Sequence, residues 1–257
     1  MVNILISGYY GFDNIGDESI LRTLVSSLRE HIPDCSLTVL SHNPTSTREK
    51  YGVEAVDRMS PMAILRAVKK CDMLISGGGS LLQDVTSSKS LHYYLSIIRC
   101  AEFFHKKVFI YSQGIGPIDR PGNRRAAAAA LKRADGIVVR DERSAALLEE
   151  IGIARDKVVI TADPVIRMKK PDGDVGAEIL RKAGVSLDGR LTVGWAIRER
   201  DTDSRFVKEL LRSIQMMKDK YNAQSVLIPF HYEEDGEVCR HIAVSYTHLR
   251  AHETLRH

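Results

Sequence analysis

The sequence predicts an α/β protein built on doubly wound parallel sheets. Two observations lead to this class. Short apolar segments rich in Val and Ile alternate with longer amphipathic segments, and glycine-bearing turns follow several of the apolar segments. Short apolar runs of this kind are typical of parallel strands that are buried on both faces. The alternation of strand and helix then favours a sheet with helices on both sides.

The expected elements of the first part of the chain follow this rhythm. Ser60 and Asp141 suit helix N-caps, Pro61 suits a first helical turn, and Gly152 suits a helix end. Strands are expected at Asn3–Ser7, Leu37–Leu40, Met73–Ser76, Val108–Ser112, Gly136–Val139 and Lys157–Thr161. Helices are expected at Glu18–Glu30, from Ser60 onwards, and at Leu91–Phe104, Asn123–Ala134 and Glu142–Ile151.

A second domain is expected after the rhythm breaks. The segment Lys169–Asp174 is polar and rich in turn formers, which indicates a linker. The sequence therefore predicts an N-terminal domain over residues 1–168 and the start of a second domain over residues 169–243. The second domain should contain Val175–Ala183 (helix), Leu191–Ile197 (strand), Ser204–Lys220 (helix), Ser225–Pro229 (strand) and Glu237–Ala243 (the next helix beginning).

Residues 244–257 do not fit either domain. They have no core-facing periodicity and no turn signal, and three of the nine histidines of the chain fall within residues 248–257. The peptide resembles translated sequencing-adapter DNA, so we interpret it as a non-native tail on a truncated chain. A metal-binding tail is the alternative. On the first interpretation, the genomic reading frame beyond codon 243 encodes further β/α units.

Composition limits the classes of partner. The net charge is +4 without a long Lys/Arg run, which argues against nucleic acid and suits an anionic substrate or an anionic membrane surface. The four cysteines are scattered without metal-ligand spacing, so no metal site is expected and a reduced cytosol is indicated. The N-terminus is a strand, not a signal peptide, and no apolar run reaches the roughly 20 residues of a membrane span.

A glycine-rich turn follows the third strand. Gly78, Gly79 and Ser80 allow a ligand to approach the backbone, and amides there, near a helix start, suit a phosphate or carboxylate. Gln83 and Asp84, just beyond, are expected to contact hydroxyl groups. The alternative is a tight strand-to-helix turn without a ligand.

The segment after the first strand points to a sugar. Asp13 would repel a pyrophosphate, so a dinucleotide is disfavoured, whereas Asp13 and Asn14 suit a sugar hydroxyl. Tyr9 and Tyr10 either stack on a sugar ring or pack in the core. Asp17 is interpreted as a helix N-terminal charge.

Further candidates stand at later strand ends, which meet at one edge of a parallel sheet. Arg140 offers a fork for a phosphate or carboxylate, while Arg143 could equally belong to a salt-bridge cluster at the helix start. The remaining candidates for substrate binding are Gln113, Gly114, Asp163 and, in the second domain, Arg198.

Six segments together resemble the polysaccharide pyruvyl transferase family, and more closely its cell-surface-anchoring, CsaB-like branch. They are SGYYGFDNIGDE, SGGGSLLQDVTSSKSLHYYL, YSQGIGP, VRDERS, ADP and GWAIR, and the resemblance spans about residues 1–243. It implies a GT-B-like fold of two Rossmann-like domains, the second incomplete here.

The resemblance also implies an activity. Such enzymes transfer pyruvate from phosphoenolpyruvate to a sugar diol as a cyclic ketal, with no metal or cofactor. The CsaB-like branch acts on N-acetylmannosamine of a lipid-linked cell-wall precursor whose product anchors S-layer proteins. Asp13 would be the base or orient the diol, and Arg140 would bind phosphoenolpyruvate. The family's Arg-Leu-His type segment is absent, so the chain as given is expected to be inactive alone.

Two other classes remain open. A GT-B glycosyltransferase using a nucleotide sugar shares the sheet and the glycine loops, and a sugar-binding module is the non-catalytic alternative. For the transferase, we expect a cytoplasmic protein that contacts the inner face of the plasma membrane to meet its acceptor. The sequence does not indicate an oligomeric state.

Overall fold

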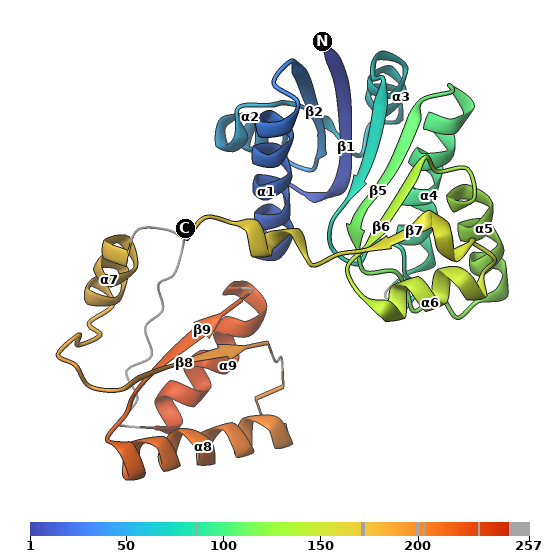
Figure 1. Ribbon diagram of the computed structural model, residues 1–257. Coiled ribbons are helices and arrows are strands. Elements are labelled where there is room, and N and C mark those ends of the chain that lie inside the picture. The colour runs from blue at the N-terminus through green and yellow to red at the C-terminus, as the bar shows by residue number, and fades with distance from the viewer. Residues whose placement is uncertain (86, 171–172, 199–200, 203, 231, 247–257) are drawn as a thin grey trace. The chain divides into compact units, whose positions relative to one another are not determined.

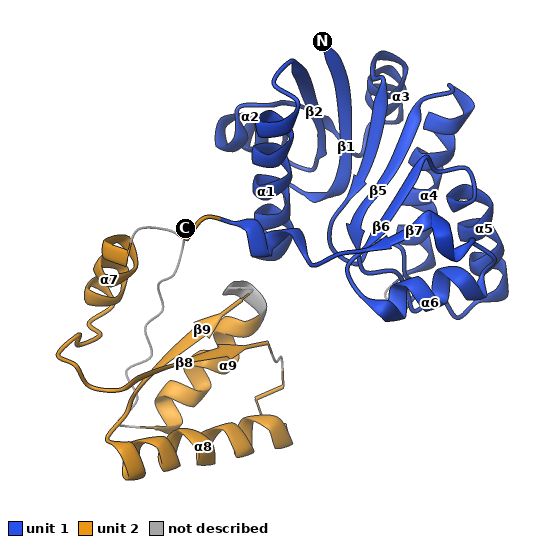
Figure 2. Cartoon of the chain, in the orientation of Figure 1, with its two compact units in different colours: residues 1–168 blue, residues 169–257 orange. Residues whose placement is uncertain are grey.

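The computed structural model describes residues 1–246 except 86, 171–172, 199–200, 203 and 231. The chain consists of two compact units, Met1–Met168 and Lys169–His257, coloured separately in Figure 2. Of the predicted tail, residues 244–245 complete the last helix, and residues 247–257 lie outside the described part of the chain. Among the described residues, no helix has both the length and the apolar character needed to cross a bilayer.

A seven-stranded parallel sheet forms the centre of the first unit (Figure 1). Its strand order is β3-β2-β1-β4-β5-β6-β7, and every neighbouring pair is parallel. The chain thus builds outwards from β1 in one direction and from β4 in the other, which is the predicted doubly wound arrangement. The strands are β1 (Val2–Tyr10), β2 (Cys35–Ser41), β3 (Glu54–Asp57), β4 (Met73–Gly77), β5 (Lys107–Gln113), β6 (Gly136–Val139) and β7 (Val158–Ile160).

Helices pack on both faces of this sheet. They are α1 (Ile15–His31), α2 (Pro44–Tyr51), α3 (Pro61–Lys70), α4 (Ser88–Phe103), α5 (Pro121–Leu131) and α6 (Glu142–Glu150), with short 3-10 helices η1 (Arg155–Lys157) and η2 (Pro164–Arg167). Ser60 and Asp141 cap α3 and α6 as predicted, since their side chains accept hydrogen bonds from the amides of Ala63 and Ser144.

Successive side chains of β1 belong to two different hydrophobic clusters, because they point to opposite faces of the sheet. Ile4 and Ile6 join the cluster that includes α1 and the end of α2. Leu5, between them, joins the cluster formed with α3, α4, α5 and α6. All three side chains are at most 1 % exposed, and burial of each contributes roughly 2 kcal/mol. The strand is therefore covered on both faces, as its continuous apolar sequence indicates.

Among the described strands and α-helices of the first unit, β3 and α2 were not anticipated from the sequence. β3 has four residues, of which only Ala55 is buried, so its pattern is too weak to identify a strand. α2 begins with Asn43 as its N-cap and Pro44 in its first turn, a start signal that was present in the sequence.

The second unit contains a smaller parallel sheet. Its strands, β8 (Thr192–Ile197) and β9 (Gln224–Pro229), are parallel and joined through α8 (Arg205–Tyr221). α7 (Gly173–Lys182) precedes them and α9 (Tyr232–Ser245) follows. Buried Ile197, Ile214 and Leu227 belong to one hydrophobic cluster from β8, α8 and β9. The predicted helix-strand-helix-strand-helix order is confirmed.

Candidate functional site

The carboxyl edge of the first sheet carries the candidate site. β1 and β4 are neighbours, but the chain continues from β1 to β2 on one side and from β4 to β5 on the other. Ligands of doubly wound proteins bind in the crevice outside the strand ends at such a reversal. The loops after β1 and β4, which hold the two longest motifs of the sequence, therefore flank the expected ligand position.

The loop after β1 is fixed by the first turn of α1. The Oδ1 atom of Asn14 accepts hydrogen bonds from the amides of Gly16 and Asp17, at 3.0 and 3.2 Å, and so caps the helix. Glu18 reaches back, and its Oε1 accepts from the amide of Gly11 at 2.8 Å. Asn14 thus has a structural task beside its expected contact with substrate.

Asp13 projects from this loop. Its backbone φ is 55°, in the left-handed region that Asp and Asn tolerate better than most residues. Its side chain is 76 % exposed, and Oδ1 lies 2.7 Å from Nζ of Lys50. The carboxylate is therefore accessible at the strand reversal, as a role towards a sugar hydroxyl requires.

Tyr10, expected to contact substrate, is a core residue. It is 1 % exposed, and its hydroxyl donates to the carbonyl of Gly77 at 2.8 Å. β1 runs on to Tyr10 instead of ending at Ser7, so Tyr10 shares a cluster and a strand face with Ile4 and Ile6. This correction follows from the strand end, which the sequence interpretation placed too early.

A stack of three aromatic rings stands beside Asp13. Tyr9 and Phe12 lie with ring centroids 4.1 Å apart and an angle of 7° between planes. Phe12 stacks in turn on His42, at 4.3 Å and 5°. Tyr9 is 39 % exposed. Of the two alternatives for the tyrosine pair, packing holds for Tyr10, whereas stacking of Tyr9 on a sugar ring stays a prediction.

The glycine turn after β4 is less suited to an anion than its sequence indicates. The amide of Gly78 donates to the carbonyl of Tyr111 at 3.1 Å, and a Cβ at Gly78 would lie 2.2 Å from Ile20. A Cβ at Gly79 would lie 2.8 Å from Oδ1 of Asp17, so a carboxylate borders the turn. Positive φ at both glycines, 72° and 68°, and these close approaches explain the glycines through packing.

Arg140 joins four loops of the carboxyl edge. Nη1 donates to Asp163 at 2.9 Å and Nη2 donates to Ser80 at 3.0 Å, while Nε lies 3.8 Å from Asp141. A Cβ at Gly114 would lie 2.8 Å from Nη2, so the guanidinium packs directly against this glycine. The structure thus brings together the predicted residues Ser80, Gly114, Arg140 and Asp163.

Asp84 is a structural anchor instead of a substrate contact. It is 7 % exposed and accepts hydrogen bonds from the amides of Asp119 and Arg120, at 2.9 and 3.1 Å, and from Nδ2 of Asn123 at 2.8 Å. The amide of Asp119, followed by the other two donors, holds the pKa of Asp84 below its usual range. Its carboxylate oxygens are committed to the start of α5.

The other predicted residues lie apart from this arrangement or inside the fold. Gln113 is fully buried, and its Nε2 donates to Oγ of Ser76 at 2.8 Å, which excludes the expected substrate contact. Gln83 is half-buried in the loop after β4. Arg143 is exposed in the first turn of α6, and Arg198 is exposed at the end of β8 in the second unit.

Arg58 was missed by the sequence interpretation. It directly follows β3, the strand that was not anticipated, and its Nη1 donates to the carbonyl of Gly8 on β1 at 3.0 Å. The sequence interpretation also missed Glu18. Its carboxylate accepts one hydrogen bond from the amide of Gly11 and a short one from the hydroxyl of Tyr51. Burial and this bond raise the pKa of Tyr51, so its hydroxyl remains a donor.

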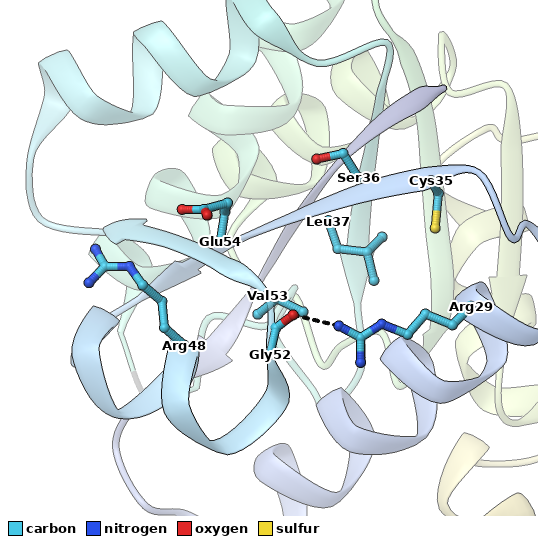
Figure 3. Close-up of a pocket in the computed structure, with 8 residues that line it drawn as sticks. All are labelled: Arg29, Cys35, Ser36, Leu37, Arg48, Gly52, Val53 and Glu54. Carbon is cyan, nitrogen blue, oxygen red and sulfur yellow. Dashed lines mark hydrogen bonds between the residues drawn. The ribbon is translucent and has the colours of Figure 1, made fainter.

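A hollow of about 370 Å³ lies at the opposite edge of the sheet (Figure 3). Cys35 and Glu54, the first residues of β2 and β3, line it, so it is at the amino ends of the strands. Arg29, also in its wall, donates to the carbonyl of Gly52 at 2.6 Å. The hollow is therefore separate from the strand reversal.

Comparison with known proteins defines the family. The family model described as polysaccharide pyruvyl transferase matches residues 14–257. The chain belongs to the polysaccharide pyruvyl transferase family. It is also 24 % identical over 239 residues to the amylovoran biosynthesis protein AmsJ of Erwinia amylovora, with 77 % of this chain and 57 % of AmsJ covered. The chain thus spans little more than half the length of that relative.

Solved structures share the fold at low sequence identity. HepE of Anabaena in complex with UDP-glucose has a TM-score of 0.63 at 10 % identity, covering 98 % of this chain and 68 % of HepE. MnaA of S. aureus with UDP has a TM-score of 0.62 at 13 % identity, with coverages of 99 % and 69 %. The UDP-GlcNAc 2-epimerase of Neisseria meningitidis has a TM-score of 0.61 at 14 % identity, with coverages of 98 % and 71 %. The predicted GT-B-like class is confirmed.

Proposed function

We propose that this chain belongs to a ketal pyruvyltransferase that uses phosphoenolpyruvate as donor and a sugar diol as acceptor. Membership of the polysaccharide pyruvyl transferase family supports the reaction class. The observation that carries the site assignment is the meeting of Arg140, Ser80 and Asp163 outside the strand ends. The accessible Asp13 in the loop after β1 stands at the same carboxyl edge of the sheet.

The reaction requires a cationic group that binds the phosphate or carboxylate of phosphoenolpyruvate, and a group that accepts a proton from a sugar hydroxyl. C3 of phosphoenolpyruvate takes a proton and becomes a methyl group, C2 forms bonds to both sugar oxygens, and the bond from C2 to the phosphate oxygen breaks. The two hydroxyl protons are released; one balances C3 and the other leaves with phosphate. Arg140 retains N–H donors beyond those directed at Asp163 and Ser80, and these suit the phosphate or carboxylate of the donor.

Asp13 and the ring stack form the proposed acceptor side. The carboxylate of Asp13 accepts or orients a sugar hydroxyl, with Lys50 holding its side chain. Tyr9, which stacks on Phe12 and is 39 % exposed, offers an aromatic surface for the apolar face of a sugar ring.

In its most specific form, the proposal makes the acceptor N-acetylmannosamine of a lipid-linked cell-wall polymer precursor, with S-layer anchoring as the outcome. The enzyme then works in the cytoplasm and touches the inner face of the plasma membrane. The CsaB-like segments of the sequence support this branch, and AmsJ, described as an amylovoran biosynthesis protein, supports a role in polysaccharide synthesis. Completion of the donor site by residues beyond this chain would make the chain inactive alone.

A GT-B glycosyltransferase is the second candidate. It is favoured by the solved structures of similar fold, which are described with UDP, UDP-glucose or UDP-GlcNAc bound. The two candidates release different products, phosphate from phosphoenolpyruvate or UDP from a nucleotide sugar.

The test measures both products with protein expressed from the complete gene. A lipid-linked disaccharide ending in N-acetylmannosamine is supplied with phosphoenolpyruvate or with UDP-glucose. We expect phosphate release only when phosphoenolpyruvate and acceptor are both present, and a pyruvyl ketal on the acceptor in its mass spectrum. UDP release without any phosphate release would overturn the proposal in favour of a glycosyltransferase.

The Asp13→Asn variant tests the acceptor side in the same assay. Asn tolerates the left-handed backbone at this position, so the loop is retained while the carboxylate is lost. We expect kcat to fall by about a hundredfold or more, the size of a general acid-base contribution, with the KM for phosphoenolpyruvate unchanged. Asp34→Asn, at an exposed position before β2, is the matched control and should keep wild-type kcat. An equal kcat in both variants would remove Asp13 from the mechanism.

A further inference from the structure

Arg58 is a buried cation whose stabilisation is unusual. It is 7 % exposed, and none of the ion pairs found among the described residues includes it. Its Nε is buried without a hydrogen-bond partner in the described part of the chain. Because a guanidinium stays charged in proteins, the fold must stabilise this charge in another way.

Four aromatic rings surround the guanidinium. The Cζ atom lies 4.8 to 5.6 Å from the ring centroids of Tyr93, Phe12, Tyr94 and Tyr9. All four distances fall within the range of cation–π attraction, which is strongest when the cation is removed from water. The rings therefore take the place of a carboxylate partner.

These contacts connect the loop after β1 to α4. On one side, Arg58 faces Tyr9 and Phe12 and donates to the carbonyl of Gly8 at 3.0 Å. On the other, its Nη2 donates to the hydroxyl of Tyr94 at 3.2 Å, and its carbonyl accepts from the hydroxyl of Tyr93 at 2.9 Å. Arg58 thus links the ring stack, which begins at Tyr9, to α4, which begins at Ser88.

We infer that Arg58 is a positioning residue for the acceptor side of the site. It holds Tyr9 and Phe12, and through the same short loop Asp13, in the geometry in which the proposed acceptor binds. This inference rests on the proposed function, since it assigns the loop of residues 9–13 to the acceptor. This role requires arginine, because its planar guanidinium carries two nitrogens that donate to Gly8 and Tyr94 at once while the plane faces the rings.

The test compares Arg58→Met with Arg58→Lys in protein expressed from the complete gene. Met fills much of the same volume and removes the cost of burying a guanidinium that has no carboxylate partner among the described residues. Lys keeps the charge and loses the fork. Arg66→Lys, at an exposed position on α3, is the matched control. Three quantities are measured: the KM values for both substrates, the melting temperature, and hydrogen exchange of amides in residues 9–13.

We expect both Arg58 variants to raise the KM for the acceptor by about tenfold, because each loses the guanidinium that donates to Gly8 and Tyr94 at once. The KM for phosphoenolpyruvate should stay at the wild-type value. Amides of residues 9–13 should exchange faster, while the Met variant should keep the wild-type melting temperature. The control should match the wild type in all three quantities.

Two results would overturn the inference. One is unchanged exchange in residues 9–13 in both variants, and the other is an equal rise of both KM values, which would indicate a general defect. If the wild type transfers no pyruvate, the proposed function fails; the exchange measurement then decides alone whether Arg58 fixes the loop. Should the Met variant not fold, the Lys variant provides the same comparison.

Discussion

Arg140 shows how a single side chain can join loops that are distant in the sequence. Its guanidinium meets Ser80, Asp163 and Asp141, and Gly114 leaves the space in which it lies. The carboxylates of Asp163 and Asp141 lie against the guanidinium, but the Arg140 side chain is still 30 % exposed. Part of the guanidinium is therefore accessible to a ligand from solvent. A planar group with five N–H donors can keep these partners and still donate to a ligand oxygen.

The guanidinium of Arg140 can be tested by replacing it with an amine. Arg140→Lys keeps the charge but cannot donate to Asp163 and Ser80 while binding an anion through a second pair of N–H groups. We expect the KM for phosphoenolpyruvate to rise by about tenfold or more, the effect of losing one charge-assisted hydrogen bond. Arg125→Lys, at an exposed position on α5, should leave that KM unchanged. If KM is unaltered in Arg140→Lys, the donor does not bind at this fork.

At the scale of elements, Asp84 anchors the loop after β4 to the start of α5. Its oxygens accept from two backbone amides and from Asn123, so it fixes a helix start that has no side-chain cap of its own. The carboxylate is committed by these three donors, which explains both its burial and its lowered pKa.

This anchor predicts a pH dependence of stability. The pKa of Asp84 is lower in the folded protein than in the unfolded chain, where it is about 3.9. Its stabilising contribution is therefore complete above that pH and is lost as the pH falls through the folded pKa. Asp84→Asn should lower the free energy of unfolding by about 2 kcal/mol at pH 7, since an amide NH₂ replaces one acceptor.

The measurement is urea unfolding of wild type and variant between pH 7 and pH 3. The difference between them should shrink as the pH falls below about 4. Asp119→Asn, whose side chain is exposed two residues before Pro121, is the control and should show little difference at either pH. A difference that stays constant with pH would mean that the carboxylate charge of Asp84 does not stabilise the loop.

Elements with strong local signals could be predicted from the sequence. Gly136–Val139 is the strand observed as β6, and Ser60 and Asp141 are the caps of their helices. The alanine run of α5 was predicted as a helix from propensity alone. Two of its buried members, Ala127 and Ala130, belong to the cluster shared with α4, so small size at a helix contact also explains the run.

Side-chain roles at the site were harder to predict, for two physical reasons. Tyr9 and Tyr10 have nearly the same chemistry, and only the true end of β1 decides which one faces the core. Arg58 depends on partners 36 and 50 residues away, Tyr94 and Gly8, which no local pattern relates to it. Convergence at the carboxyl edge was predictable, because parallel topology alone places those strand ends together.

The whole molecule consists of two units with separate cores. The buried residues of the two larger clusters lie between Ile4 and Val158, and those of the two smaller clusters lie between Ala183 and Ile242. Each described cluster therefore draws all its members from one unit. Compact units with their own cores can in principle fold independently.

We predict that the two units unfold in separate transitions. Leu91 in α4 and Ile214 in α8 are both fully buried, each in the core of a different unit. Truncation of either to Ala should cost about 2–5 kcal/mol, because it removes apolar contacts and leaves a cavity. In calorimetry, Leu91→Ala should lower only the transition of the first unit and Ile214→Ala only that of the second. The peptide of residues 1–168 expressed alone should retain the first transition unchanged. If both variants instead shift one common transition, the units fold as a single cooperative body, and independent folding is wrong.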